Sequence, residues 1–95
     1  MEVYLVAKIT EINNSDKYNK YTELARPIIE KFGGEYVINS TKVENLKGGE
    51  NPEKILILKF PSKEKYQECF SSDEYKEIVS LRLESTKSEA YLVEK

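Results

Sequence analysis

Arg82 is the residue whose placement says most about possible chemistry. It follows Tyr75, Ile78 and Val79 at helical steps of three and four, so it shares their stripe on one helix face. A guanidinium on the inward face of a helix needs a partner, because burying an unpaired charge costs free energy. Arg82 therefore either faces a pocket and binds a carboxylate or another anion, or it forms a structural ion pair or extends to the edge of the core.

Tyrosine is the dominant aromatic residue, with seven copies against three phenylalanines and no tryptophan. Tyr18 and Tyr21 lie on the inward stripe of one predicted helix, and Tyr75 lies on that of another. A buried phenol normally finds a hydrogen-bond partner. Tyr21 and Tyr75 are thus either pocket residues that orient a small organic ligand near Arg82, or core residues with their hydroxyls at the rim.

Three further side chains have both a chemical and a structural interpretation. Lys8 and Lys59 interrupt apolar alternations, either as pocket cations or bases with a depressed pKa, or as lysines that extend to solvent. Cys69 stands beside Phe70 with no histidine or cationic cluster nearby in the sequence. That setting favours a buried, inert thiol over a nucleophile.

The complete absence of histidine narrows the possible chemistry. With no His, one Cys and one Met, the chain excludes zinc fingers, His-ligated metal sites and Ser-His or Cys-His catalysis. We accordingly expect neither a metal nor a cofactor. The 15 basic and 17 acidic side chains leave a net charge of -2, which argues against nucleic acid as a partner.

The periodicity of the apolar residues predicts the elements that must position these side chains. Residues 3–12 alternate as in a strand, and the following helix has capping residues before it and Gly33 after it. The order β-α-β-β-α-β, with its second helical region broken in two, predicts an α+β, ferredoxin-like fold with an antiparallel sheet. We expect strands at 3–12, 35–40, 54–60 and 88–94, an irregular continuation at 42–46, and helices at about 16–32, 62–70 and 71–85.

Both faces of the predicted sheet are apolar. At residues 55–60 the side chains that point to either face of the sheet are mainly apolar. In the first and last strands, Tyr4 and Tyr91 point to the face opposite the other apolar set of the strand. The ferredoxin-like arrangement covers one face with helices, and 95 residues leave nothing for the other. Because a second copy is the simplest cover, we expect a homodimer with the two sheets packed face to face and both tyrosines at its interface.

Composition and segment lengths bound the rest of the molecule. Cys69 has no partner for a disulfide, and the N-terminus shows no basic region or cleavage-like site. The longest uncharged apolar runs fall far short of the roughly 20 residues that span a bilayer. We expect a single domain over residues 1–95, in a cytoplasmic protein that does not contact membranes.

Short motifs occur in order along nearly the whole chain. They are the first strand Val3–Ala7, then Asp16, Tyr18 and Tyr21, then Pro27 and Phe32-Gly33-Gly34, then Phe60-Pro61-Ser62, then Ser72-Asp73-Glu74-Tyr75 with Arg82 seven residues later. The ordered set resembles the DUF1330 family, a group of small proteins within the dimeric α+β barrel superfamily. The chain departs from that pattern at Asp73, where a proline is common.

The resemblance implies a dimeric α+β barrel but no particular reaction, because the function of the family is undetermined. Superfamily relatives include small monooxygenases, haem-degrading enzymes and lactone isomerases. We therefore expect metal-free small-molecule chemistry, isomerase-like or oxygenase-like, in a pocket between sheet and helices. The alternatives are a non-catalytic ligand-binding protein and a structural dimeric module. The candidate ligand-binding residues are Arg82, Tyr75, Tyr21 and Ser72, of which the first three are also catalytic candidates, and the expected ligand is a small organic anion.

Overall fold

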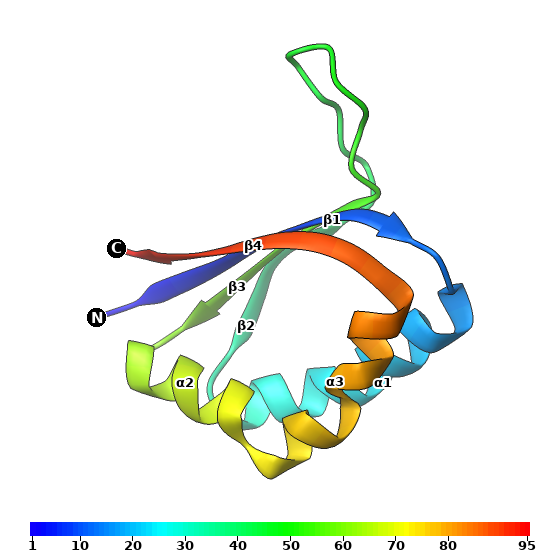
Figure 1. Cartoon of the computed structure of the whole chain (residues 1–95). Coiled ribbons are helices and arrows are strands. Elements are labelled where there is room, and N and C mark those ends of the chain that lie inside the picture. The colour runs from blue at the N-terminus through cyan, green and yellow to red at the C-terminus, as the bar shows by residue number, and fades with distance from the viewer.

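The computed structural model describes all 95 residues and has the predicted order of elements. Four strands form one antiparallel sheet in the order β2-β3-β1-β4, and three helices cover one of its faces (Figure 1). The elements are β1 (Val3–Ile12), α1 (Ser15–Lys31), β2 (Glu35–Ser40), β3 (Lys54–Phe60), α2 (Lys63–Ser71), α3 (Asp73–Ser85) and β4 (Thr86–Glu94). This is the ferredoxin-like α+β fold that the sequence predicts.

Capping side chains explain where the helices begin. The Oδ1 atom of Asn14 accepts a hydrogen bond from the Lys17 amide at 3.1 Å, and the Ser62 hydroxyl does the same for the Lys65 amide at 3.2 Å. Glycine ends α1: Gly33 has a φ of 86°, in the left-handed region that other residues avoid. None of the three helices combines the length and the apolar composition needed to cross a membrane.

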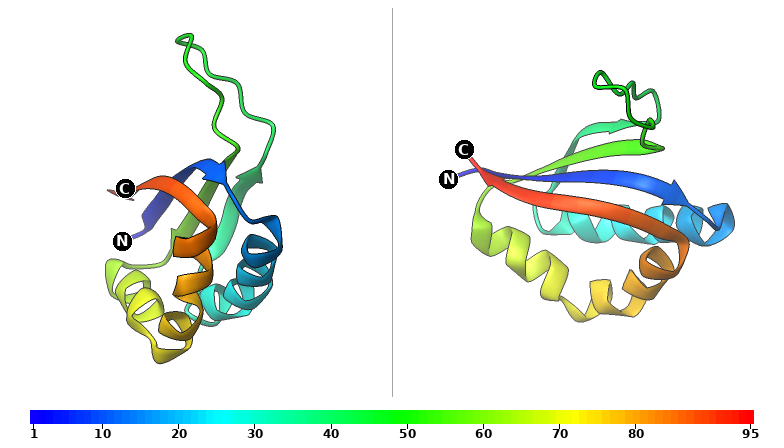
Figure 2. Two further views of the ribbon diagram at one scale, coloured as in Figure 1. Left: turned by 45° about the vertical axis from the view of Figure 1, so that its right-hand side comes forward. Right: turned by 45° about the horizontal axis from the view of Figure 1, so that its top comes forward.

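Two sequence expectations differ from the structure. Residues 42–46 do not continue strand β2; they belong to a long loop that starts after Ser40 and ends before Lys54. Strand β4 begins at Thr86, two residues earlier than expected, because α3 leads into it without a loop. Residues 41–53, which we call the arm, project from the side of the sheet away from the helices in every view (Figures 1 and 2).

The core lies between the sheet and the helices. Its most deeply buried large side chains include Val3, Leu58 and Phe60, which come from the helix-facing sets of β1 and β3. On α1 the buried stripe ends at Ile29, whereas Ile28 is only half-buried.

The opposite face of the sheet, here called the open face, has no helix over it (Figure 2). Strand register places Ile38 beside Ile57, Ile57 beside Val6, and Val6 beside Tyr91, so one apolar row crosses all four strands. Tyr91 is 59% exposed and Ile38 is 43% exposed. The sheet is therefore apolar on both faces, as its sequence predicts.

Candidate functional site

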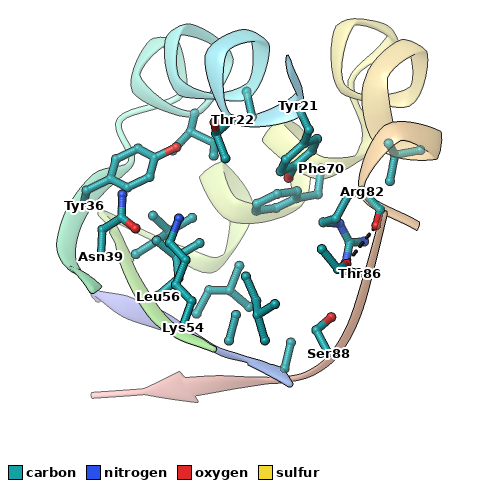
Figure 3. Close-up of a pocket in the computed structure, with 18 of the residues that line it drawn as sticks. Tyr21, Thr22, Tyr36, Asn39, Lys54, Leu56, Phe70, Arg82, Thr86 and Ser88 are labelled. Atoms are coloured by element: carbon teal, nitrogen blue, oxygen red, sulfur yellow. Dashed lines mark hydrogen bonds between the residues drawn. The ribbon is translucent and has the colours of Figure 1, made fainter. Parts of the chain in front are cut away.

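A cavity of about 370 Å³ separates the helices from the sheet (Figure 3). Residues from all four strands and all three helices line it, and 15 of its 21 lining residues are hydrophobic. The lining includes no aspartate or glutamate. This volume lies within the range of about 300–1,000 Å³ that is usual for small-molecule sites. The apolar walls favour an organic ligand.

Arg82 extends from α3 into this cavity (Figure 3). Its side chain makes no salt bridge, and its buried Nε atom has no hydrogen-bond partner. The neighbouring hydroxyl of Thr86 is occupied, because it donates to the Arg82 backbone carbonyl at 2.8 Å. A buried guanidinium N–H without an acceptor is costly, and an acidic oxygen in the cavity would satisfy it.

The structural alternative for Arg82, an ion pair with an acidic residue, is not present, and the glutamate Glu30 on the facing helix α1 has another partner. Glu30 lies 3.7 Å from Arg26, on the same helix. Arg82 therefore has an unsatisfied donor and faces a cavity without acids.

Tyr21 and Tyr75 meet across the helical layer at the cavity. Their hydroxyl oxygens are 2.7 Å apart, and both side chains are buried. Burial, reinforced by the neighbouring Tyr75, raises the pKa of Tyr21 far above its ordinary value, while the charge of Arg82 acts in the opposite direction. Both phenols line the cavity, and the pair shares one hydrogen bond between two hydroxyl protons. One O–H can thus donate to a ligand.

Ser72, the fourth candidate, is not among the residues that line the cavity. Its hydroxyl accepts a hydrogen bond from the Tyr75 amide at 3.2 Å and donates one to the Cys69 carbonyl at 2.7 Å. These two bonds make it the N-cap of α3 and the junction to α2. Ser72 therefore positions Tyr75 at the start of the helix and does not itself reach the cavity.

Lys54 is a cavity residue that sequence reasoning missed (Figure 3). Its Nζ donates to the Tyr18 hydroxyl at 3.0 Å and lies 4.9 Å from the centre of the Tyr18 ring. Burial, with a smaller contribution from Arg26, lowers the pKa of Lys54, and burial raises the pKa of Tyr18 to about 12. The signal in the sequence is its alternation with Leu56, because both residues belong to the helix-facing set of β3.

The two lysines singled out in the sequence lie on the open face instead. Lys8 pairs with Glu89 at 2.9 Å, and Lys59 pairs with Glu2 at 3.3 Å. The favourable partners raise the pKa of both lysines, so neither is a base with a depressed pKa. Their interpretation as solvent-facing residues is the one that matches the structure.

Cys69 is fully buried, and burial raises its pKa to about 11. A thiol in that state is a poor nucleophile at neutral pH. No three side chains of the types His, Cys, Asp and Glu gather closely enough to hold a metal ion. The chemistry-bearing groups at the cavity are thus a guanidinium, an ammonium and phenols.

Solved structures share this fold across almost the whole chain. A protein of unknown function from Rhodopseudomonas palustris, RPA0582, aligns with a TM-score of 0.82 and 18% identity, over 99% of this chain and 82% of its own. A dimeric ferredoxin-like protein of unknown function from Jannaschia sp. CCS1 aligns with a TM-score of 0.81 and 9% identity, over the full length of both chains. SnoaB, a cofactor-independent oxygenase from Streptomyces nogalater, aligns with a TM-score of 0.71 and 12% identity, over 99% of this chain and 92% of its own.

At these identities the likeness shows the fold alone. No curated protein matches the chain. The family model described as "Domain of unknown function (DUF1330)" matches residues 2–95. Because that match spans nearly every residue, the resemblance in the sequence motifs is confirmed, and the chain belongs to the DUF1330 family.

Proposed function

We propose that the cavity binds a small organic anion through Arg82 and promotes metal-free chemistry on it. The observation that carries this proposal is the buried, unpartnered Nε of Arg82 in a cavity of about 370 Å³ with no acidic side chain. A structural module would not need such a cavity, so its volume favours ligand binding. Bidentate contact with a guanidinium suits the two oxygens of a carboxylate.

The phenols define what such a site would do to its ligand. Because the pKa of Tyr21 is strongly raised, its hydroxyl stays protonated at neutral pH and acts as a hydrogen-bond donor rather than a base. A donor beside a cation stabilises negative charge that develops on a carbonyl oxygen, as when a carbon acid becomes an enolate. Isomerisation and cofactor-free oxygenation both begin with that step: an activated carbon acid gives its C–H proton to water, because the cavity lining holds no carboxylate base, and dioxygen as co-substrate is the oxidant in the second case.

The similarity to SnoaB supports the oxygenase-like branch by analogy of fold. Non-catalytic binding of the same anion is the second candidate, because it requires the cavity and Arg82 but no proton transfer. The two candidates differ in one property, which is turnover of a bound compound.

The experiment is a thermal-shift screen of carboxylate-bearing compounds, with hits repeated on Arg82→Met. We expect hits to raise the Tm of the wild type and to lose at least about tenfold in affinity on Arg82→Met, which removes a charge-assisted contact. Lys76→Met is the matched control, because Lys76 is exposed on the same helix and does not line the cavity. A wild type that no carboxylate stabilises would contradict the proposal.

A second measurement separates enzyme from binder. Each hit with an acidic C–H bond is incubated with protein in D₂O and followed by proton NMR. Loss of the C–H signal that depends on Tyr21 and Tyr75 indicates catalysis of proton transfer. Binding without exchange or product assigns the cavity to non-catalytic binding.

We further propose that the chain forms a homodimer through its open face. The apolar row of Ile38, Ile57, Val6 and Tyr91 is flanked on either side by ion pairs, Lys8 with Glu89 and Lys59 with Glu2. Such a patch is typical of an interaction surface with an apolar centre and a polar rim. The dimeric relative from Jannaschia sp. CCS1 has the same fold and supports a second copy as the occupant.

The arm extends on the same side as this open face (Figure 2). Asn45 stiffens its tip, because its side chain accepts from the Lys47 amide at 2.8 Å and donates to the Glu50 carbonyl at 3.2 Å. Leu46, beside it, is 85% exposed. In a face-to-face dimer the arm would flank the second copy and give Leu46 an apolar contact.

A cytoplasmic location stays a prediction that depends on the unpaired, buried Cys69.

A further inference from the structure

Two cations of the cavity lack any carboxylate partner. Arg82 reaches it from α3 and Lys54 reaches it from β3, and Figure 3 shows the two side chains on different sides of the cavity. Neither forms a salt bridge, whereas Lys8 and Lys59 on the open face both do. From this arrangement we infer that the ligand carries two acidic groups, one held by Arg82 and the other by Lys54. The inference rests on the proposed function, since it concerns the same cavity.

Charge balance is the first argument. Two positive groups face one apolar cavity whose lining offers no negative charge, and each such group is costly when it is partly buried and unpaired. A ligand with one acidic group would neutralise one of them and leave the other uncompensated. A ligand with two acidic groups would satisfy both.

The setting of Lys54 is the second argument. The only hydrogen bond of its ammonium is to the Tyr18 hydroxyl, so two of its three N–H donors are free. Burial lowers the pKa of Lys54, which shows that its protonated form lacks compensating negative charge. An acidic oxygen beside Tyr18 would accept from the ammonium and from the phenol together.

The apolar and aromatic walls of the cavity suggest the body of the ligand. Leu56 comes from the floor of the sheet, and Tyr36 and Phe70 present aromatic rings from β2 and α2 (Figure 3). Such walls favour a flat, unsaturated skeleton, which stacks on rings and loses little conformational freedom on binding. The ligand class is therefore an aromatic or conjugated diacid, in which the second acidic group is a carboxylate, an enol or a phenol.

The test compares benzoate with the three benzene dicarboxylates, which set a second carboxylate at three different spacings. Isothermal titration calorimetry is performed on the wild type, on Lys54→Met and on Arg82→Met. We expect at least one dicarboxylate to bind the wild type about tenfold more tightly than benzoate does, and Lys54→Met to reduce it to the affinity of benzoate. Benzoate itself should lose more affinity on Arg82→Met than on Lys54→Met, whereas the dicarboxylate should lose affinity on both. Lys20→Met, at an exposed position of α1, is the control.

The outcomes separate the two proposals. If benzoate and every dicarboxylate bind alike, and Lys54→Met does not discriminate between them, the role of Lys54 is refuted while anion binding stands. If no carboxylate binds the wild type, anion binding fails, and the inference fails with it. Circular dichroism of Lys54→Met verifies that the variant is folded, and Lys54→Gln provides a second variant that retains a polar end.

Discussion

At the scale of single residues, the cavity combines two hydroxyls that are hydrogen-bonded to each other with a guanidinium N–H that has no acceptor. The hydroxyls of Tyr21 and Tyr75 are held 2.7 Å apart inside the helical layer, whereas Arg82 has a buried donor with no acceptor. A protein tolerates an unsatisfied donor of this kind where function requires it. The unsatisfied donor of Arg82 therefore points to ligand binding, and the tyrosine pair, which uses one O–H within the pair, has its other O–H left to donate to that ligand.

The tyrosine pair gives the first prediction. Tyr21→Phe and Tyr75→Phe should each lower the free energy of unfolding by about 1–2 kcal/mol, because each leaves the other buried hydroxyl without its partner. The double variant should cost less than the sum of the two, with a coupling of about 1 kcal/mol. Urea unfolding of the four proteins measures this cycle. Strictly additive losses would show that the hydroxyls do not interact.

The buried thiol gives a prediction for pH. The pKa of Cys69 is raised from 9.0 to about 11, so the unfolded chain loses this proton at lower pH than the folded protein does. The contribution to stability is complete below pH 9 and should decline as the pH rises towards 11. The test measures urea midpoints from pH 7.5 to 11 for the wild type and for Cys69→Ala. Because the tyrosines contribute equally to both curves, the difference between the two curves reports on Cys69. Identical slopes for the two proteins would contradict the assignment.

Sequence reasoning identified Arg82, Tyr21 and Tyr75 because helical periodicity fixes the face on which a residue lies. It missed Lys54 because both alternating sets of this strand are mainly apolar, so the alternation alone does not show which set faces the helices. It also gave Ser72 a place at the cavity, although the hydroxyl is engaged in capping α3. Capping and pocket lining both select small polar residues, so the sequence alone does not separate them.

At the scale of elements, a β-bulge in β2 decides which of its side chains reach the cavity. The register between β2 and β3 shifts between Tyr36 and Ile38. Without this bulge, strict alternation would place Ile38 on the same face as Tyr36. With it, Ile38 joins the apolar row on the open face, while Tyr36 and Asn39 both line the cavity. Element order was predictable from periodicity, but the bulge was not, because it depends on pairing between strands.

The turn from α1 to β2 gives a steric prediction. A methyl group at Gly34 would lie 2.5 Å from the Ile29 side chain and 2.9 Å from the Ile29 carbonyl oxygen. Gly34→Ala should therefore lower the free energy of unfolding by about 2–3 kcal/mol. Gly48→Ala, in the arm, is the comparison, because nothing lies near its added methyl and only its φ of 85° opposes the change. A cost of about 1 kcal/mol is expected there. Equal losses by thermal unfolding would contradict the steric account.

At the scale of the whole molecule, the two faces of the sheet have different roles. Its helix-facing side forms the floor of the cavity, and its open face carries the apolar row with ion pairs on either side. The apolar open face was predictable from the sequence, because both sets of alternating residues in the strands are apolar. A sheet that is apolar on both faces is normally covered on both. The arm was expected to be partly a strand, and its projection beside the open face follows only from the structure.

This division gives a prediction for assembly. Tyr91→Glu places a charge at the β4 end of the apolar row and should convert a dimer into a monomer at micromolar concentration, with little change in fold because Tyr91 is 59% exposed in the single chain. Leu83→Glu is the control, since Leu83 is 64% exposed on α3, in the helical layer away from the open face. Analytical ultracentrifugation measures both. A wild type that sediments as a monomer at these concentrations would contradict the dimer.

The most direct test of the cavity as an anion site observes the Nε–H group of Arg82 itself. The chain has two arginines, Arg26 and Arg82, and the Nε of Arg82 is buried, so its N–H signal should be protected from solvent exchange and resolved in a ¹H–¹⁵N spectrum. Titration with benzoate and the benzene dicarboxylates should shift the Arg82 Nε–H signal downfield, as it gains an acceptor, and leave that of Arg26 nearly unchanged. An Arg82 Nε–H signal that stays in place while saturating ligand binds elsewhere would contradict the account.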